Sequence, residues 1–142
     1  MELILDTNIF NWLIDGKFTI GDLPAESKLF ASHIQVDEIN RTTDSERRAQ
    51  LMLMLAKHVS IVPTETMVVG VSRWGEAKLS DGKRYNEILS ALNARNKSRR
   101  NNVQDSLIGE IALINGFTLV TADRDLASVM NSINCAVKLI AQ

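Results

Sequence analysis

The stretch ELILDTN at residues 2–8 decides the fold. Its three consecutive apolar residues, followed directly by a polar turn, are typical of a short strand that is buried on both faces of a parallel sheet. Open α/β sheets bind their ligands at the carboxyl ends of such strands, so Asp6 is a candidate site residue. Asp6 could instead cap the helix that begins near Ile9, and taken alone this stretch favours the capping role.

Short apolar segments and helical patterns alternate through the rest of the chain. Further strands are expected at residues 28–31, 59–62, 117–121 and 136–140, and helices at 9–14, 33–41, 45–58, 65–79, 84–94, 102–115 and 123–130. Ser32 and Asp44 are suitable N-caps for the helices that follow them. The alternation predicts an α/β fold with a mainly parallel sheet, built as a single domain over residues 1–142.

The composition is that of an ordinary globular domain, with 45% hydrophobic and 23% charged residues among 142. A net charge of −1 neither requires nor excludes a nucleic-acid partner. The single cysteine, Cys135, excludes internal disulfides and a cysteine-rich zinc site, and its apolar surroundings predict a buried thiol. The chain shows no signal-peptide pattern and no apolar stretch near the roughly 18 residues of a membrane span, so we expect a cytoplasmic protein.

Acidic residues are expected to gather at one edge of the sheet. Helices of right-handed βαβ units run antiparallel to the strands, so helix N-termini meet the carboxyl ends of the strands. The acids that this rule brings to the common edge are Asp6, Glu38, Asp105, Asp123 and Asp125. An acid in a first helical turn also has a simpler role, because it stabilises the helix dipole by about 0.3–1 kcal/mol. Two observations favour a shared site: Glu38 lies too deep in its helix to cap it, and Asn101 or Asn102 could already cap the helix of Asp105.

Converging carboxylates repel each other strongly unless a cation neutralises them. His33 and His58 are poorly placed to help, and a ligand set made only of oxygens favours Mg²⁺ or Mn²⁺ over zinc. Such an ion suits phosphoryl chemistry, because it polarises phosphate oxygens and makes water more acidic. The chain has no G-x-S-x-G elbow, no Walker A loop and no G-x-G-x-x-G fingerprint. Metal-assisted hydrolysis of a phosphodiester is therefore the chemistry that uses the most residues.

A basic segment separates two of the expected helices. Its cations, which fall within six positions, are Arg95, Lys97, Arg99 and Arg100, and asparagine and serine lie between and after them. A local cluster of cations and amides is a candidate surface for binding RNA. A solvated helix end or loop explains the same pattern equally well.

Four motifs together resemble a PIN-domain nuclease, in particular the VapC-like toxins of bacterial and archaeal toxin–antitoxin pairs. The motifs are LILDTN at 3–8, Glu38 after a short strand, DSLIGEIA at 105–112 and LVTADRDL at 119–126. They stand in the family's order and cover nearly the whole chain. Each motif is short, and their specificity comes from the combination with the matching length.

The resemblance implies a parallel five-stranded sheet in the order 3-2-1-4-5, with helices on both faces. The positions that match Asp6, Glu38, Asp105 and Asp123 bind one or two Mg²⁺ or Mn²⁺ ions in this family and act in catalysis. RNA hydrolysis there leaves a 5′-phosphate and a 3′-hydroxyl.

The resemblance also implies supporting residues and partners. The position that matches Thr121 supports the metal or its water, and the one that matches Asn8 orients the first acid. Family members form homodimers and are silenced by an antitoxin protein. They differ in whether the acid at 123, the acid at 125, or both reach the metal. We favour Asp123, because it lies nearer the strand end, and keep Asp125 as a supporting candidate.

Two other functions are alternatives to a nuclease. A non-catalytic PIN-like module would bind RNA or a protein without cleaving, but the presence of all four acids argues against it. An aspartate-based phosphatase would use Asp6 as a covalent nucleophile. That pattern places a second aspartate two residues later, where this chain has Asn8.

Overall fold

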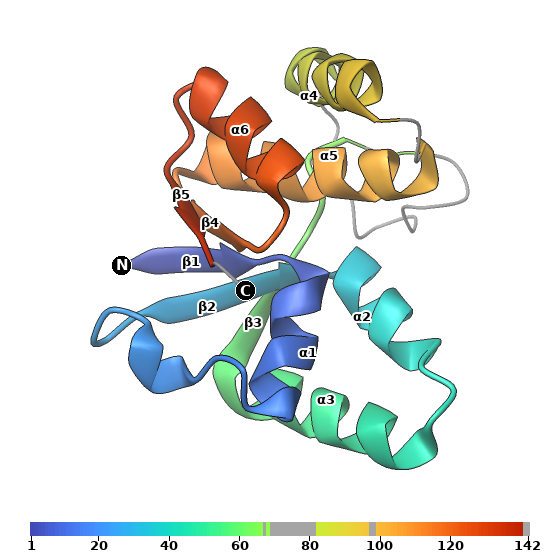
Figure 1. Ribbon diagram of the computed structural model, residues 1–142, viewed down its shortest axis with the longest axis vertical. Helices are drawn as coiled ribbons and strands as arrows, with labels where there is room; N and C mark the ends of the chain where they lie inside the picture. The colour runs from blue at the N-terminus through green and yellow to red at the C-terminus, as the bar shows by residue number, and fades with distance from the viewer. Residues whose placement is uncertain (67, 69–81, 97–98, 141–142) are drawn as a thin grey trace.

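A single parallel sheet of five strands forms the centre of the computed structural model, which describes residues 1–66, 68, 82–96 and 99–140. The strands are β1 (Glu2–Leu5), β2 (Lys28–Ser32), β3 (Val59–Val62), β4 (Thr118–Thr121) and β5 (Val137–Leu139). Their order is β3-β2-β1-β4-β5, and every neighbouring pair is parallel (Figure 1). The predicted sheet and its strand order are confirmed.

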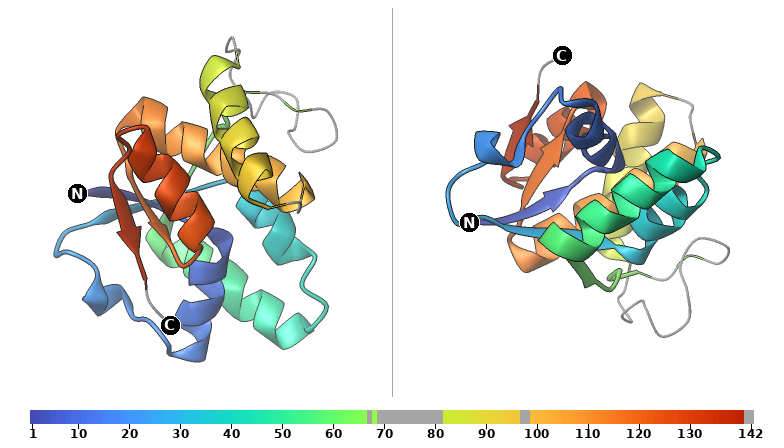
Figure 2. Two further views of the ribbon diagram at one scale, coloured as in Figure 1. Left: turned by 45° about the horizontal axis from the view of Figure 1, so that its top comes forward. Right: turned by 90° about the horizontal axis from the view of Figure 1, so that it is seen from below.

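Helices cover both faces of this sheet. Those in the described residues are α1 (Thr7–Asp15), α2 (His33–Asn40), α3 (Ser45–His58), α4 (Lys83–Arg95), α5 (Arg99–Asn115) and α6 (Arg124–Ser132), with a short 3₁₀ helix η1 (Ile20–Asp22). One face carries α1 and α3, and the other carries α5 and α6, with α4 packed on the outside of these two (Figures 1 and 2). None of the helices described is long and apolar enough to cross a membrane.

The apolar run of β1 explains its central position. Leu3 and Leu5 point into the core beneath α1 and α3, whereas Ile4 points into the core beneath α5 and α6. All three side chains are fully buried. Alternate residues of a strand face opposite sides of a sheet, so an uninterrupted apolar run is stable only where both faces are covered. Cys135 lies in the second core as a buried free thiol, as predicted.

Two helices begin earlier than predicted. Helix α1 begins at Thr7 because the carboxylate of Asp6 accepts a hydrogen bond from the Thr7 N–H at 2.8 Å. Helix α5 begins at Arg99, so the prediction that Asn101 or Asn102 caps it was wrong. The Asn102 side chain instead donates to Oδ1 of Asn93 at 2.9 Å and ties α5 to α4. That partner is nine residues away, and capping rules consider only the nearest neighbours.

The helix predicted at 65–79 does not begin where the sequence placed it. Thr64 forms an isolated bridge, and Glu65 and Thr66 lie in a bend. Apart from Val68, which is also not helical, the rest of that segment lies outside the described residues. Helices α3 and α4 match their predicted spans to within one residue.

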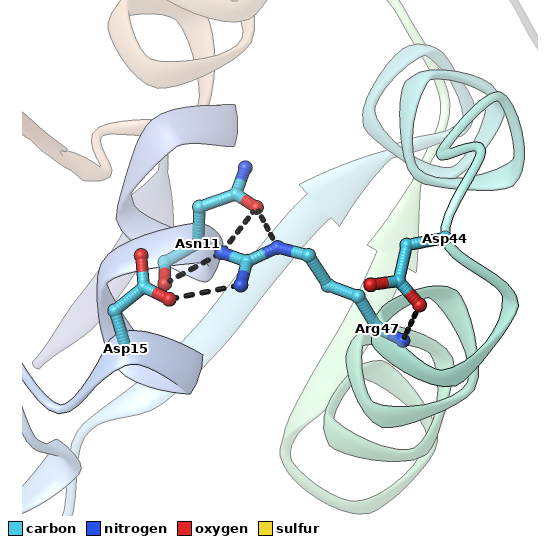
Figure 3. Close-up of polar contacts among 4 residues, drawn as sticks. All are labelled: Asn11, Asp15, Asp44 and Arg47. Atoms are coloured by element: carbon cyan, nitrogen blue, oxygen red, sulfur yellow. Dashed lines mark hydrogen bonds and ion pairs between the residues drawn. The ribbon is translucent and has the colours of Figure 1, made fainter.

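The guanidinium of Arg47 joins α3 to α1 (Figure 3). It donates to Oδ1 of Asn11 from Nε at 3.1 Å and from Nη2 at 3.0 Å, and it forms an ion pair with Asp15 at 2.8 Å. The hydrogen bond from Arg47 lowers the pKa of Asp15. Asp44 caps α3 as predicted, accepting from the N–H groups of Glu46 and Arg47. Because the pair is partly solvated, its main effect is to fix the spacing of the two helices.

Gln35 connects the end of β1 to the start of α2. Its side chain is fully buried, donates from Nε2 to the carbonyl of Leu5 and accepts from the Ser32 N–H at 2.7 Å. Ser32 does occupy the predicted N-cap position, but its own hydroxyl has no hydrogen-bond partner. Gln35 therefore positions α2 relative to the residue that precedes Asp6.

We expect Gln35→Met to lower the free energy of unfolding by roughly 2–4 kcal/mol. The substitution keeps the side-chain volume but leaves two buried backbone groups unpaired, at a cost of about 1–3 kcal/mol each. Urea unfolding measures the difference. Gln50→Met, an exposed position on α3, is the matched control and should change stability by less than about 0.5 kcal/mol. Equal stability of the two variants would contradict this role for Gln35.

Candidate active site

The four acids of the predicted site line one cavity of about 140 Å³. Its lining residues are Asp6, Thr7, Asn8, Glu38, Asn101, Gln104, Asp105 and Asp123. The acids come from the ends of β1 and β4 and from helices α2 and α5. These lie at the topological switch point of the sheet, where β1 is paired with β2 on one side and β4 on the other.

Both carboxylate oxygens of Asp6 accept a hydrogen bond. Oδ2 accepts from the Thr121 hydroxyl at 2.8 Å, and Oδ1 accepts from the Thr7 N–H at 2.8 Å. The Asp6 N–H donates to the carbonyl of Val120 at 2.9 Å, which fixes its backbone against β4. Burial raises the pKa of Asp6; the hydrogen bonds from Thr121 and Thr7 oppose this shift, and the charge of Asp123 adds to it. Asp6 therefore caps α1 and also lines the cavity.

Asp123 and Asp125 have different environments. Asp123 caps α6 through Oδ1, which accepts from the N–H groups of Asp125 at 2.8 Å and Leu126 at 3.1 Å. Its own N–H donates to the Thr121 hydroxyl at 3.0 Å, so Thr121 links Asp123 to Asp6. Asp125 is not among the cavity residues, and its carboxylate pairs with Arg95 at 3.8 Å.

Among the residues that the structure describes, the carboxylate of Asp105 lacks the hydrogen bonds that stabilise the ionised forms of Asp6 and Asp123. It lies in the second turn of α5, not the first as predicted, because the helix begins at Arg99. Within the described part of the chain, no hydrogen bond or ion pair reaches its carboxylate. Burial, followed by the charges of Asp6, Asp123 and Glu38, raises its pKa to about 8. The acids are thus close enough to oppose each other's ionisation.

The other predicted residues differ in their positions relative to this cavity. Asn8 lines the cavity, but the hydrogen bonds to Asp6 come from Thr7 and Thr121. Arg95 ends α4, where it pairs with Asp125 and donates to Ser128 at 2.9 Å. Arg99 and Arg100 begin α5, but their side chains lie outside what the structure describes, and so does Lys97. The proposed RNA-binding role of this segment stays a prediction.

Sequence reasoning missed three described residues of the cavity, Thr7, Asn101 and Gln104. Asn101 precedes Asp105 by four residues, and helical periodicity places residues four apart on the same face. That spacing could have identified Asn101, had the helix been extended to include it. Gln104 stands next to Asp105 and had no comparable signal.

The chemistry of the lining fits a hard divalent cation. Its ligating groups are carboxylate, amide and hydroxyl oxygens, and neither histidine nor cysteine lines the cavity. In the described residues, no three Asp, Glu, His or Cys side chains are already arranged to hold a metal ion. A bound cation would relieve the mutual repulsion of the carboxylates.

We expect Asp105→Asn to stabilise the metal-free protein increasingly as the pH rises. Asp105 keeps its proton in the folded chain up to a pKa of about 8, but loses it in the unfolded chain above its ordinary value of 3.8. Between these values the folded state holds the extra proton, so raising the pH favours unfolding of the wild type. Each unit of pKa difference between the folded and unfolded chain changes the free energy of unfolding by about 1.4 kcal/mol, which urea unfolding can measure.

Urea unfolding with a chelator at about pH 5 and about pH 8 tests this expectation. The stability difference between Asp105→Asn and the wild type should grow toward the higher pH. Asp44→Asn, which changes a capping acid outside the cavity, is the control. A difference that stays constant between the two pH values would show that Asp105 does not hold a proton in the folded chain.

Comparison with known proteins finds similarity to solved structures but none at the level of sequence. No protein-family model matches it, and no curated protein matches by sequence. A chain of VapBC2 from Rickettsia felis, solved bound to a DNA fragment from its promoter, superposes with a TM-score of 0.64 at 18% identity, covering 98% of both chains. A chain of VapBC-1 from nontypeable Haemophilus influenzae gives 0.56 at 16% identity, again covering 98% of each.

An archaeal protein has a similar fold. A domain of a functionally unknown protein from Methanocaldococcus jannaschii gives a TM-score of 0.55 at 14% identity, covering 99% of this chain and 91% of that one. At these identities the likeness concerns the fold. Over nearly its whole length, the chain has the fold found in VapBC complexes.

Proposed function

We propose that this protein is a Mg²⁺- or Mn²⁺-dependent endoribonuclease and the toxin of a toxin–antitoxin pair. The observation that carries the proposal is the convergence of Asp6, Glu38, Asp105 and Asp123 in one cavity, with mutual repulsion that helps to raise the pKa of Asp105 to about 8. Four separate helix caps would not need to be this close. The four sequence motifs and the fold shared with VapBC chains support the same function.

The four acids are the residues that would hold the cation. When bound, it supplies polarisation of a phosphate oxygen and makes a nearby water molecule more acidic. Thr121 and Thr7 hold Asp6 through hydrogen bonds already formed, so its orientation does not depend on the ion. Asp105 has no such restraint within the described structure, so we expect its carboxylate to adjust most when a cation or a phosphodiester enters.

The substrate that we propose is single-stranded or looped RNA. Unpaired RNA exposes a backbone that can bend into a small cavity, whereas a duplex presents its phosphates on a rigid surface. We also propose an antitoxin partner, because two of the structures that share the fold are VapBC complexes. A homodimer is proposed from the family resemblance of the four sequence motifs.

We expect millimolar Mn²⁺ to raise the unfolding midpoint of the wild type and to leave Asp6→Asn and Asp105→Asn nearly unchanged. An ion at a hundredfold above its dissociation constant stabilises the native state by about 2.7 kcal/mol. Both variants should also fail to cleave labelled RNA. Asparagine is as good an N-cap as aspartate, so Asp6→Asn should retain α1.

The matched control is Asp44→Asn. Asp44 caps α3 as Asp6 caps α1, but it lies outside the cavity, so this variant should keep both the Mn²⁺ response and RNA cleavage. Undiminished cleavage by Asp6→Asn and Asp105→Asn would remove the proposed site. RNA binding without cleavage by the wild type in any divalent metal would favour a non-catalytic module.

A further inference from the structure

An amide with no hydrogen-bond partner lines the cavity beside the four acids. Gln104, on α5, is only 9% exposed, yet its side chain makes no hydrogen bond to any described residue. Buried polar groups are normally paired, and an unpaired one reduces the stability of the fold. The Gln35 amide, also buried, bonds the Leu5 carbonyl and the Ser32 N–H. The amide of Gln104, in contrast, has no partner among the described residues, and it lies where a ligand would enter.

The cavity lacks strong donors for an anionic ligand. Its carboxylates accept hydrogen bonds but cannot donate when ionised, and a phosphodiester also only accepts. No lysine or arginine is among the described residues that line it. The Gln104 amide supplies two N–H donors at this position, and it is better sheltered from water than Asn8 and Asn101, both exposed.

We propose that Gln104 is a substrate-binding residue that donates a hydrogen bond from Nε2 to a non-bridging oxygen of the phosphodiester to be cleaved. The inference rests on the proposed nuclease function and assigns a phosphate donor to the most buried amide of its acidic site. A cation neutralises the phosphate from any direction, whereas a hydrogen bond also fixes its orientation.

The size of the cavity favours a phosphate over a base as the partner of Gln104. A volume of about 140 Å³ corresponds to four or five water molecules at about 30 Å³ each. That space accommodates a cation and one phosphate group. A nucleobase is bulkier than a phosphate group, so this space favours the phosphate as the partner of Gln104.

Two substitutions test the proposed hydrogen bond from the Gln104 amide to the phosphate. Gln104→Met removes the amide at nearly constant volume and keeps a good helix former. Gln104→Glu keeps the shape of the side chain, replaces the N–H donors with acceptor oxygens and adds a negative charge, so it gives a second measurement if the methionine variant folds poorly. Gln50→Met, at an exposed position on α3, is the matched control. All are compared in single-turnover cleavage of an RNA oligonucleotide with saturating Mn²⁺.

We expect both Gln104 variants to cleave more slowly by on the order of ten- to a hundredfold, as for loss of one hydrogen bond to a charged group. Gln50→Met should cleave at the wild-type rate. The Mn²⁺-induced rise in unfolding midpoint should be retained in Gln104→Met, because the amide contacts the phosphate. An RNA with sulfur in place of one non-bridging oxygen at the cleaved bond should slow the wild type but slow Gln104→Met no further, since the same contact is already lost.

The outcomes separate this inference from the function on which it rests. A wild type that cleaves RNA, with Gln104 variants equally fast, overturns the inference and leaves the nuclease intact. Loss of the Mn²⁺ response in Gln104→Met would make Gln104 a cation ligand and also overturn the phosphate contact. A wild type that cleaves no RNA overturns the proposed function, and the inference with it.

Discussion

Leu3, Ile4 and Leu5 are buried on both faces of the sheet, and this burial fixes β1 at its centre. With β1 central and every strand parallel, the carboxyl ends of β1 and β4 lie side by side. Asp6 and Asp123 follow those ends, and Thr121 bonds to both. The position of the candidate site is therefore a direct consequence of where the apolar side chains are buried.

Capping a helix and lining a site are compatible roles for one carboxylate. Asp6 uses Oδ1 to accept from the Thr7 N–H and Oδ2 to accept from Thr121, and Asp123 caps α6 with a single oxygen. Asp44 shows the capping role alone, outside the cavity. The cap anchors the acid to a rigid helix end, which is a suitable way to hold a carboxylate that other carboxylates repel.

Two acids on α5, the buried Glu110 and the half-buried Asp105, have very different hydrogen-bonding environments. Burial raises the pKa of both Glu110 and Asp105. Glu110 accepts hydrogen bonds from the Thr66 hydroxyl at 2.9 Å and from the Tyr85 N–H at 3.2 Å. These two hydrogen bonds lower its pKa and so oppose the effect of burial. Asp105 accepts no hydrogen bond within the described residues, and the charges of neighbouring acids raise its pKa further. A partly buried carboxylate without such hydrogen bonds reduces stability, and such a cost is commonly found at functional sites.

The sequence by itself determined the strands, their parallel arrangement, most helix spans and the common edge of the four acids. Apolar periodicity and capping residues act over a few positions, so they can be read locally. Only the tertiary structure decided that Asn102 bonds to Asn93 instead of capping α5, that Asp125 pairs with Arg95, and that Gln104 faces the acids. Each of these outcomes depends on which side chains from distant segments become neighbours, and that is fixed by packing of the whole chain.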